Sequence, residues 1–192
     1  MTLPTDQPPP LARSHAEADL YLFRQPCRTC GHVEVLTVQG FSFRQQDGYE
    51  LRRLRTRCGN CGAEDAYVFR FPPDGSAPET GPLRFGGPEQ SQLLDPGEWL
   101  LVAGDMVGEL PPDPRGLAPQ QRRALRDRVD VALAAVGEAA KFVDPDENAV
   151  PAVAFWSRTG YELFARQPWL FTREQLAEQA AGYRDLLARY AD

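Results

Sequence analysis

The chain has 192 residues, of which 42% are hydrophobic and 25% charged, and its formal net charge is −6. These proportions are ordinary for a soluble globular protein. No run reaches the roughly 18 apolar residues that a membrane span needs, and the first residues lack the basic start and apolar run of a signal peptide. We therefore expect a cytoplasmic protein with no membrane-spanning segment.

The negative charge is confined to the second part of the chain. Residues 1–75 contain nine arginines and nine acidic residues, whereas residues 76–192 contain twelve basic and eighteen acidic residues. An acidic surface repels a phosphate backbone, so the second part is not expected to bind nucleic acid nonspecifically. The neutral first part leaves nucleic-acid binding open.

Residues 1–13 are rich in proline and polar side chains, which predicts a disordered tail. Ser14 is followed three residues later by Glu17, the spacing of a capping box. This pair predicts a short helix over residues 16–23.

The next segments carry the pattern of a β-sheet. Residues 32–45 and 66–71 alternate along the chain and are rich in β-branched and aromatic side chains, as strands are. Asp47-Gly48 is a strong hairpin signal, and residues 49–57 follow it as the returning strand. We predict an antiparallel sheet of three strands.

Residues 72–94 are rich in proline and glycine at their start and predict a linker. Helical patterns follow in residues 98–110, 120–143, part of 152–166, and the stretch after Thr172. The fold class is therefore α+β. The predicted parts are a tail (1–13), a sheet domain (14–71), a linker (72–94) and a bundle of about four helices (95–192).

Three tryptophans fall in or beside the predicted helices: Trp99, Trp156 and Trp169. A large aromatic ring usually anchors the packing between helices, so we expect these residues in the helical core. The alternative is that one of them is exposed and contacts a partner.

All four cysteines occur in two matched motifs, CRTCG at residues 27–31 and CGNCG at residues 58–62. Cytoplasmic thiols stay reduced, so paired Cys-x-x-Cys motifs indicate metal ligands rather than disulfides. Four thiolates suit one tetrahedral Zn²⁺ with Zn–S distances of about 2.3 Å. The glycine that ends each motif allows the backbone to turn toward the sulfur atoms.

These two motifs on either side of a predicted hairpin resemble a zinc ribbon. The resemblance covers residues 25–71 and implies a bound Zn²⁺ held by Cys27, Cys30, Cys58 and Cys61. The prolines often seen inside such motifs are absent, since Arg28 and Gly59 stand in their place. Zinc ribbons bind nucleic acids, bind proteins or serve only as structural staples, so the resemblance predicts a metal and leaves the function open.

Three other uses of the cysteines are open: a rubredoxin-like iron site, a dithiol oxidoreductase, and four thiols without a metal. The chain lacks the Pro/Gly/Trp-rich segment of rubredoxins, and a dithiol oxidoreductase needs only one such motif. Zinc is the interpretation that the paired motifs favour. His32 directly follows the first motif and is expected to be a surface histidine rather than a ligand.

The predicted strand that leads into Cys58 carries Arg52, Arg53, Arg55 and Arg57. With the phenylalanines of neighbouring strands, these arginines could bind a nucleic-acid strand through phosphate contacts and stacking. The alternatives are a solvated arginine face opposite a buried phenylalanine face, and arginines that pair with the acidic helical part.

The sequence contains no recognisable catalytic set, and a metal with four cysteine ligands has no open position for a substrate. We therefore expect a non-enzymatic zinc-binding adaptor whose partner is another protein, as in inhibitor or immunity proteins. The first alternative is a nucleic-acid-binding zinc ribbon that uses the arginine strand. The second is an enzyme with a pocket between the ribbon and the helices.

Overall fold

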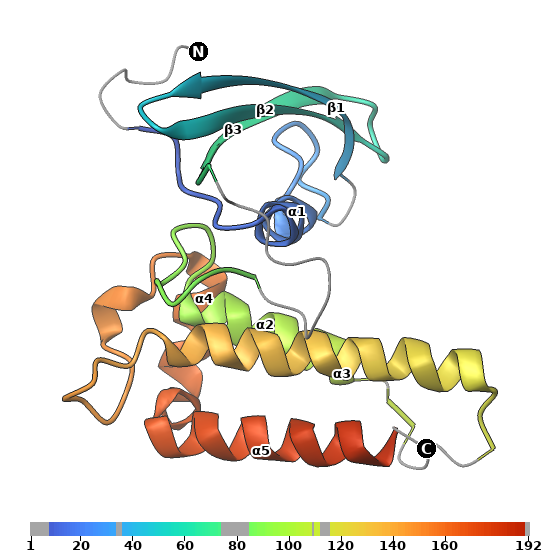
Figure 1. Cartoon of the computed structure of the whole chain (residues 1–192), viewed down its shortest axis with the longest axis vertical. Coiled ribbons are helices and arrows are strands. Elements are labelled where there is room, and N and C mark those ends of the chain that lie inside the picture. The colour runs from blue at the N-terminus through green and yellow to red at the C-terminus, as the bar shows by residue number, and fades with distance from the viewer. Residues whose placement is uncertain (1–7, 34–35, 74–84, 109, 112–115, 191–192) are drawn as a thin grey trace. The chain divides into compact units, whose positions relative to one another are not determined.

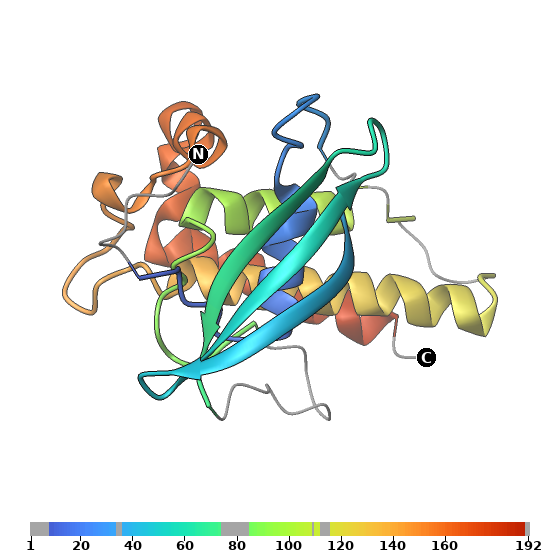
Figure 2. The same ribbon diagram turned by 90° about the horizontal axis from the view of Figure 1, so that it is seen from above.

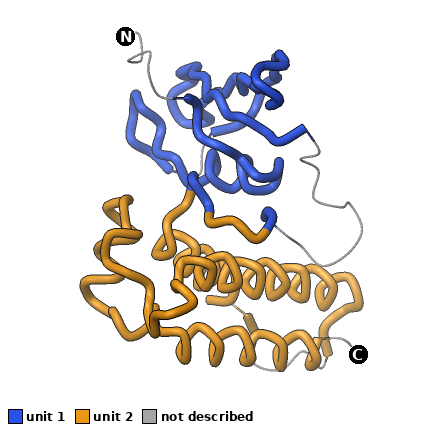
Figure 3. Tube along the Cα trace, turned by 60° about the vertical axis from the view of Figure 1, so that its left-hand side comes forward, with its two compact units in different colours: residues 1–79, 85–87, 91–93 blue, residues 80–84, 88–90, 94–192 orange. Residues whose placement is uncertain are grey.

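The computed structural model describes residues 8–33, 36–73, 85–108, 110–111 and 116–190. The chain forms two compact units (Figure 3). Unit 1 comprises residues 1–79, 85–87 and 91–93, and unit 2 comprises residues 80–84, 88–90 and 94–192. An antiparallel three-stranded sheet is followed by helices, which confirms the α+β class. Residues 1–7 of the predicted tail and 74–84 of the predicted linker lie outside the described residues.

The sheet of unit 1 consists of β1 (Leu36–Gln46), β2 (Tyr49–Cys58) and β3 (Glu64–Phe71), in the order β1-β2-β3 (Figure 2). Asp47 and Gly48 connect β1 to β2 with φ values of 51° and 78°. Two consecutive positive φ angles are the signature of a type I′ turn, which matches the twist of the flanking strands. The predicted hairpin is therefore confirmed.

The strand register divides the sheet into two faces of different chemistry. We call the first the aromatic face, and its members are Phe41, Phe43, Arg52, Leu54, Tyr67, Phe69 and Phe71. We call the second the arginine face, and its members are Arg44, Arg53, Arg55, Arg57 and Arg70. Successive side chains of a strand point to opposite faces, so Arg53, Arg55 and Arg57 of β2 lie on the face opposite Arg52.

The helix α1 (His15–Arg24) covers part of the aromatic face, as Figures 1 and 2 show. The ring of Tyr21 packs edge to face on that of Phe69 at a centroid distance of 5.8 Å, and the ring centroids of His15 and Phe71 lie 4.7 Å apart. Phe69 and Phe71 are consequently buried, whereas Phe41 and Phe43 on β1 are 56% and 62% exposed. The alternative of a buried phenylalanine face opposite a solvated arginine face is therefore confirmed for Phe69 and Phe71 and wrong for Phe41 and Phe43.

The start of α1 confirms the predicted cap, since the Ser14 hydroxyl accepts a hydrogen bond from the Glu17 N–H. The residues just before it differ from the prediction. The N–H of Ala12 donates to the carbonyl of Arg70, and the N–H of Arg70 donates to the carbonyl of Pro10. Because residues 10–12 lie along β3, this end of the predicted disordered tail is ordered.

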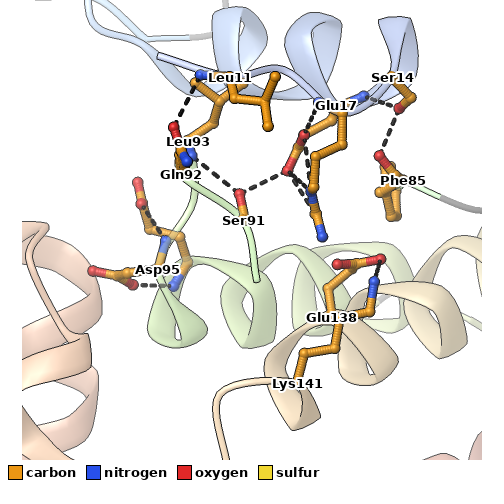
Figure 4. A network of polar contacts seen from close by, with 12 residues as sticks. Leu11, Ser14, Glu17, Phe85, Ser91, Gln92, Leu93, Asp95, Glu138 and Lys141 are labelled. Atoms are coloured by element: carbon orange, nitrogen blue, oxygen red, sulfur yellow. Dashed lines mark hydrogen bonds and ion pairs between the residues drawn. The ribbon is translucent and has the colours of Figure 1, made fainter. Parts of the chain in front are cut away.

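Glu17 is fully buried and holds together three segments of unit 1 (Figure 4). Its carboxylate accepts hydrogen bonds from the backbone and guanidinium of Arg13 and, at 2.7 Å, from the hydroxyl of Ser91. The hydroxyl of Ser14 donates to the carbonyl of Phe85 at 2.6 Å. Residues 85–87 and 91–93 therefore belong structurally to unit 1, although the sequence placed them in the linker.

Replacing Glu17 with alanine is expected to lower the free energy of unfolding of unit 1 by about 3–5 kcal/mol, because it removes a buried carboxylate that is paired with the Arg13 guanidinium and bonded to Ser91. Hydrogen exchange of the α1 amides measures the loss. Asp19→Ala on the same helix is the control, since Asp19 is exposed and should change stability by no more than about 0.5 kcal/mol. Equal effects of the two substitutions would contradict a role for the buried pair.

Unit 2 contains α2 (Pro96–Val107), α3 (Pro119–Ala140), α4 (Arg158–Arg166) and α5 (Arg173–Arg189), with short 3₁₀ helices η1 (Ala152–Ala154) and η2 (Pro168–Phe171). α3 packs against α2 and α5, and α2 packs against α4. Two details differ from the prediction. α2 ends at Val107 rather than at residue 110, and α3 ends at Ala140 rather than at residue 143. The short helix predicted within residues 152–166 is confirmed as α4, which Ser157 caps.

Trp99 is fully buried in unit 2, as expected, but Trp156 and Trp169 are 52% and 56% exposed. The prediction that the tryptophans anchor the helical core is therefore wrong for two of the three. No helix in the described ranges combines the length and the apolar character that crossing a membrane requires.

One carboxylate in unit 2 joins the starts of two helices. Asp95 is fully buried, and it accepts hydrogen bonds from the N–H of Glu98 in α2 at 2.9 Å and from the N–H of Ser157 at 2.7 Å. Gly160, in the first turn of α4, lies so close to Asp95 that a Cβ atom there would overlap the carboxylate. The absence of a side chain at Gly160 is thus a condition of this contact.

Candidate metal centre

The two cysteine motifs form two loops of the same geometry in unit 1. In the first, the N–H of Gly31 donates to the carbonyl of Cys27 at 2.8 Å; in the second, the N–H of Gly62 donates to that of Cys58 at 2.9 Å. The two glycines have φ values of 74° and 73°, in the left-handed region that favours glycine. The repeated sequence therefore produces a repeated backbone turn.

The four sulfur atoms converge on one point. All lie within 4.8 Å of one another, and the Cys27–Cys61 and Cys30–Cys58 Sγ distances are both 3.7 Å. A disulfide needs sulfurs about 2.05 Å apart, so these distances exclude one. A tetrahedron with metal–sulfur bonds of about 2.3 Å has sulfur–sulfur edges of about 3.8 Å. The cluster fits a tetrahedral metal ion.

Hydrogen bonds to sulfur favour thiolates in the first loop. The backbone N–H of Cys30 and then that of Thr29 lower the pKa of Cys27. The backbone N–H of His32 and then the side-chain amide of Asn60 lower the pKa of Cys30 to about 6. Donors of this kind offset the negative charge of metal-bound thiolates.

Cys61 shows the opposite behaviour. The N–H of Ala63 favours its thiolate, but burial and the neighbouring thiols outweigh this bond and raise the pKa of Cys61 to about 12. The physical reason is that hydrogen bonds with the sulfurs of Cys30, Cys58 and Cys27 favour the protonated form of the Cys61 thiol. A cation at the centre would favour the deprotonated form of every thiol around it.

No match to this chain was found among protein-family models, curated proteins or solved structures. The cysteine cluster itself therefore carries the argument for a metal. It contains the four predicted ligands, Cys27, Cys30, Cys58 and Cys61. His32 is not part of it among the described residues, and its Nδ1 lies 3.3 Å from the amide nitrogen of Asn60.

Asn60 is a residue of the site that the sequence did not indicate. Its amide donates to the Cys30 Sγ at 3.5 Å, so a side chain from the second loop orients a ligand of the first. The only hint in the sequence that Asn60 belongs to the site is its position between the two cysteines of the second motif. It carries little weight without the structure, because only the folded sheet brings Asn60 to the other loop.

The four arginines of β2 do not act as one set. Arg53, Arg55 and Arg57 are exposed on the arginine face, and among the described residues none of them forms an ion pair. Arg52 points to the aromatic face, where it pairs with Glu50 and lies 5.2 Å from the ring centroids of Phe41 and Phe71. Arg52 thus belongs to the packing beside α1.

Arg44 on β1 joins the exposed arginine face, although the sequence did not group it with the others. The register places Arg44 opposite Leu51 and Gly40 opposite Arg55. The Arg55 Nη2 atom lies 3.1 Å from the position that a Cβ on Gly40 would occupy, so its guanidinium extends over β1. The guanidinium groups of Arg44 and Arg55 therefore place positive charge on β1, which is an edge strand of the sheet.

Unit 2 contains a shallow pocket of about 260 Å³ between α3 and α5. Its lining consists of apolar residues and two arginines: Val136, Gly137, Ala140, Val143, Arg173, Leu176, Ala177, Ala180 and Arg184. Arg173 already donates to the carbonyls of Asp144, Pro145 and Glu147. The lining offers no nucleophile and no acid–base pair, so this pocket carries no catalytic argument.

Proposed function

We propose that this protein is a zinc-stapled adaptor that binds another protein through unit 1. The observation that carries the metal is the convergence of four sulfur atoms within 4.8 Å of one another, with two of their separations at the 3.7 Å that suits the edge of a tetrahedral site. A site closed by four cysteines holds a metal for structure, because no position is left for water or substrate. Zinc fits this role better than iron, since it needs no redox partner.

The position of the site within the sheet supports a stapling role. Cys58 is the last residue of β2, and Cys27 and Cys30 follow α1 in the chain. One ion would therefore tie the end of the central strand to the segment after the helix that covers it. A small sheet with one helix buries little apolar surface, and such units commonly need a staple.

A protein partner is favoured over a single-stranded nucleic acid by the geometry of the sheet. Sheets that bind single-stranded nucleic acid combine cationic and aromatic side chains on one surface, so that the bases stack on the aromatic rings while the cations neutralise the phosphates. Here the exposed arginines lie on one face, and Phe41 and Phe43 lie on the other. Pairing of the arginines with the acidic part of the chain stays a prediction.

Elemental analysis of protein purified without added metal tests the proposal, and about one zinc per chain is expected. Iron in place of zinc, visible as a coloured protein, would overturn the structural-zinc assignment. Protein with neither metal and with four freely reactive thiols would overturn the metal site altogether.

A further inference from the structure

The strand β1 forms an open edge of the sheet. It pairs with β2 on one side, and among the described residues no segment pairs with its other side. The register shifts between Val38 and Gly40, after which residues 40–46 run regularly beside β2. Every second residue of such a strand presents its N–H and C=O to solvent, and these groups can accept a further strand.

The two sides of this edge carry different chemistry. On the aromatic face, Phe41 and Phe43 are more than half exposed, and their rings lie 6.4 Å apart. On the arginine face, Arg44 is exposed and the guanidinium of Arg55 extends over Gly40. Edge strands are usually protected by charges, prolines or bulges, and β1 has a bulge between Val38 and Gly40. The regular residues after this bulge nevertheless expose two phenylalanines on one face, as surfaces that bind a partner do.

We infer that β1 binds an extended segment of another protein in which acidic and apolar residues alternate, and that this segment adds a fourth strand to the sheet. This inference rests on the proposed function and names the partner's chemistry. An added strand would lie about 4.8 Å from β1, with its side chains alternating between the faces. Its apolar residues would contact Phe41 and Phe43, and its acidic residues would meet Arg44 and Arg55.

The same charges argue against two other occupants. A second copy pairing through β1 would extend one arginine face with another, and like charges placed side by side repel. A nucleic-acid strand would satisfy the arginines but would lie on the face opposite Phe41 and Phe43. An alternating acidic and apolar segment satisfies both faces at once.

Titration of the zinc-loaded full chain with a fluorescent heptapeptide of alternating glutamate and valine tests the inference. We expect saturable binding that weakens at least about tenfold in the double variant Phe41→Ser/Phe43→Ser and in Arg44→Gln/Arg55→Gln. The controls are Trp169→Ser, an equally exposed aromatic in unit 2, and Arg158→Gln, an exposed arginine in unit 2. Both controls should bind the peptide as the parent protein does.

A peptide of the same composition with its glutamates and valines in two separate blocks should bind at least about tenfold more weakly, because only the alternating order serves both faces. Equal binding of the two peptides would overturn the inference. So would tighter binding of oligothymidine than of the peptide, or a dimer that the Phe41→Ser/Phe43→Ser variant converts to monomer. Zinc-loaded protein that binds no peptide overturns this inference alone, whereas protein without metal overturns the proposed function.

Discussion

Replacing Cys58 with serine is expected to weaken zinc binding, so that the purified protein contains less than one zinc per chain, and to lower the melting temperature of unit 1 by about 10 °C or more. Cys58 is almost fully buried at the end of β2, and its sulfur lies 3.7 Å from that of Cys30. Binding of a structural zinc ion contributes about 10–16 kcal/mol, so the loss of one ligand in four removes roughly 3 kcal/mol. Zinc content by elemental analysis and melting by scanning calorimetry measure the two effects.

Thr29→Ala is the matched control, because Thr29 is exposed between the two cysteines of the first motif and supplies no side-chain ligand. It should retain about one zinc per chain and melt as the parent protein does. All three tryptophans lie in unit 2, so their fluorescence should not change in the Cys58 variant. Full zinc content and unchanged melting in Cys58→Ser would refute a structural site.

Replacing Gly160 with alanine is expected to lower the free energy of unfolding of unit 2 by roughly 3 kcal/mol. The new methyl group would overlap the buried carboxylate of Asp95, which has no room to withdraw because it caps α2 and binds the N–H of Ser157. Crowding in a packed site and the loss of a helix cap both contribute. Urea unfolding followed by tryptophan fluorescence reports on unit 2 directly.

The comparison that isolates the cause is Gly182→Ala in α5. Nothing lies within 4 Å of a Cβ atom placed on Gly182, so this substitution should stabilise α5 by up to about 1 kcal/mol through helix propensity alone. Opposite signs of the two effects are therefore expected. Stabilisation by both substitutions would show that Asp95 and its neighbours rearrange at little cost.

The parts of the fold that the sequence predicted are those encoded by local chemistry. The Asp47-Gly48 turn is determined by two residues that tolerate positive φ, and Ser14 marks a helix start because its side chain caps the first turn. The four ligands were predictable for the same reason, since each short loop places two sulfurs together before any tertiary contact forms. Asn60 was not, because its partner lies in the other loop.

Exposure was harder to predict, because it depends on which residues a distant element covers. Phe41 and Phe69 occupy the same face of the sheet, but the side chains of α1 pack on Phe69 and leave Phe41 exposed. A strand pattern identifies a face and says nothing about the width of the helix that packs there. The exposure of Trp156 and Trp169 has the same origin, since Trp156 lies in the short connection between η1 and α4 and Trp169 lies in η2, neither in one of the long helices.

The contribution of residues 85–87 and 91–93 to unit 1 determines how the protein can be truncated. A fragment that ends at residue 73 would keep the sheet, α1 and every cysteine, yet it would lose the hydroxyl of Ser91 from the buried Glu17 carboxylate and the carbonyl of Phe85 from Ser14. A fragment that starts at residue 14 would lose Arg13 and the residues that lie along β3. The smallest fragment that retains these contacts runs from about residue 8 to residue 93, and it is the one suited to separate expression, isotope labelling and peptide titration.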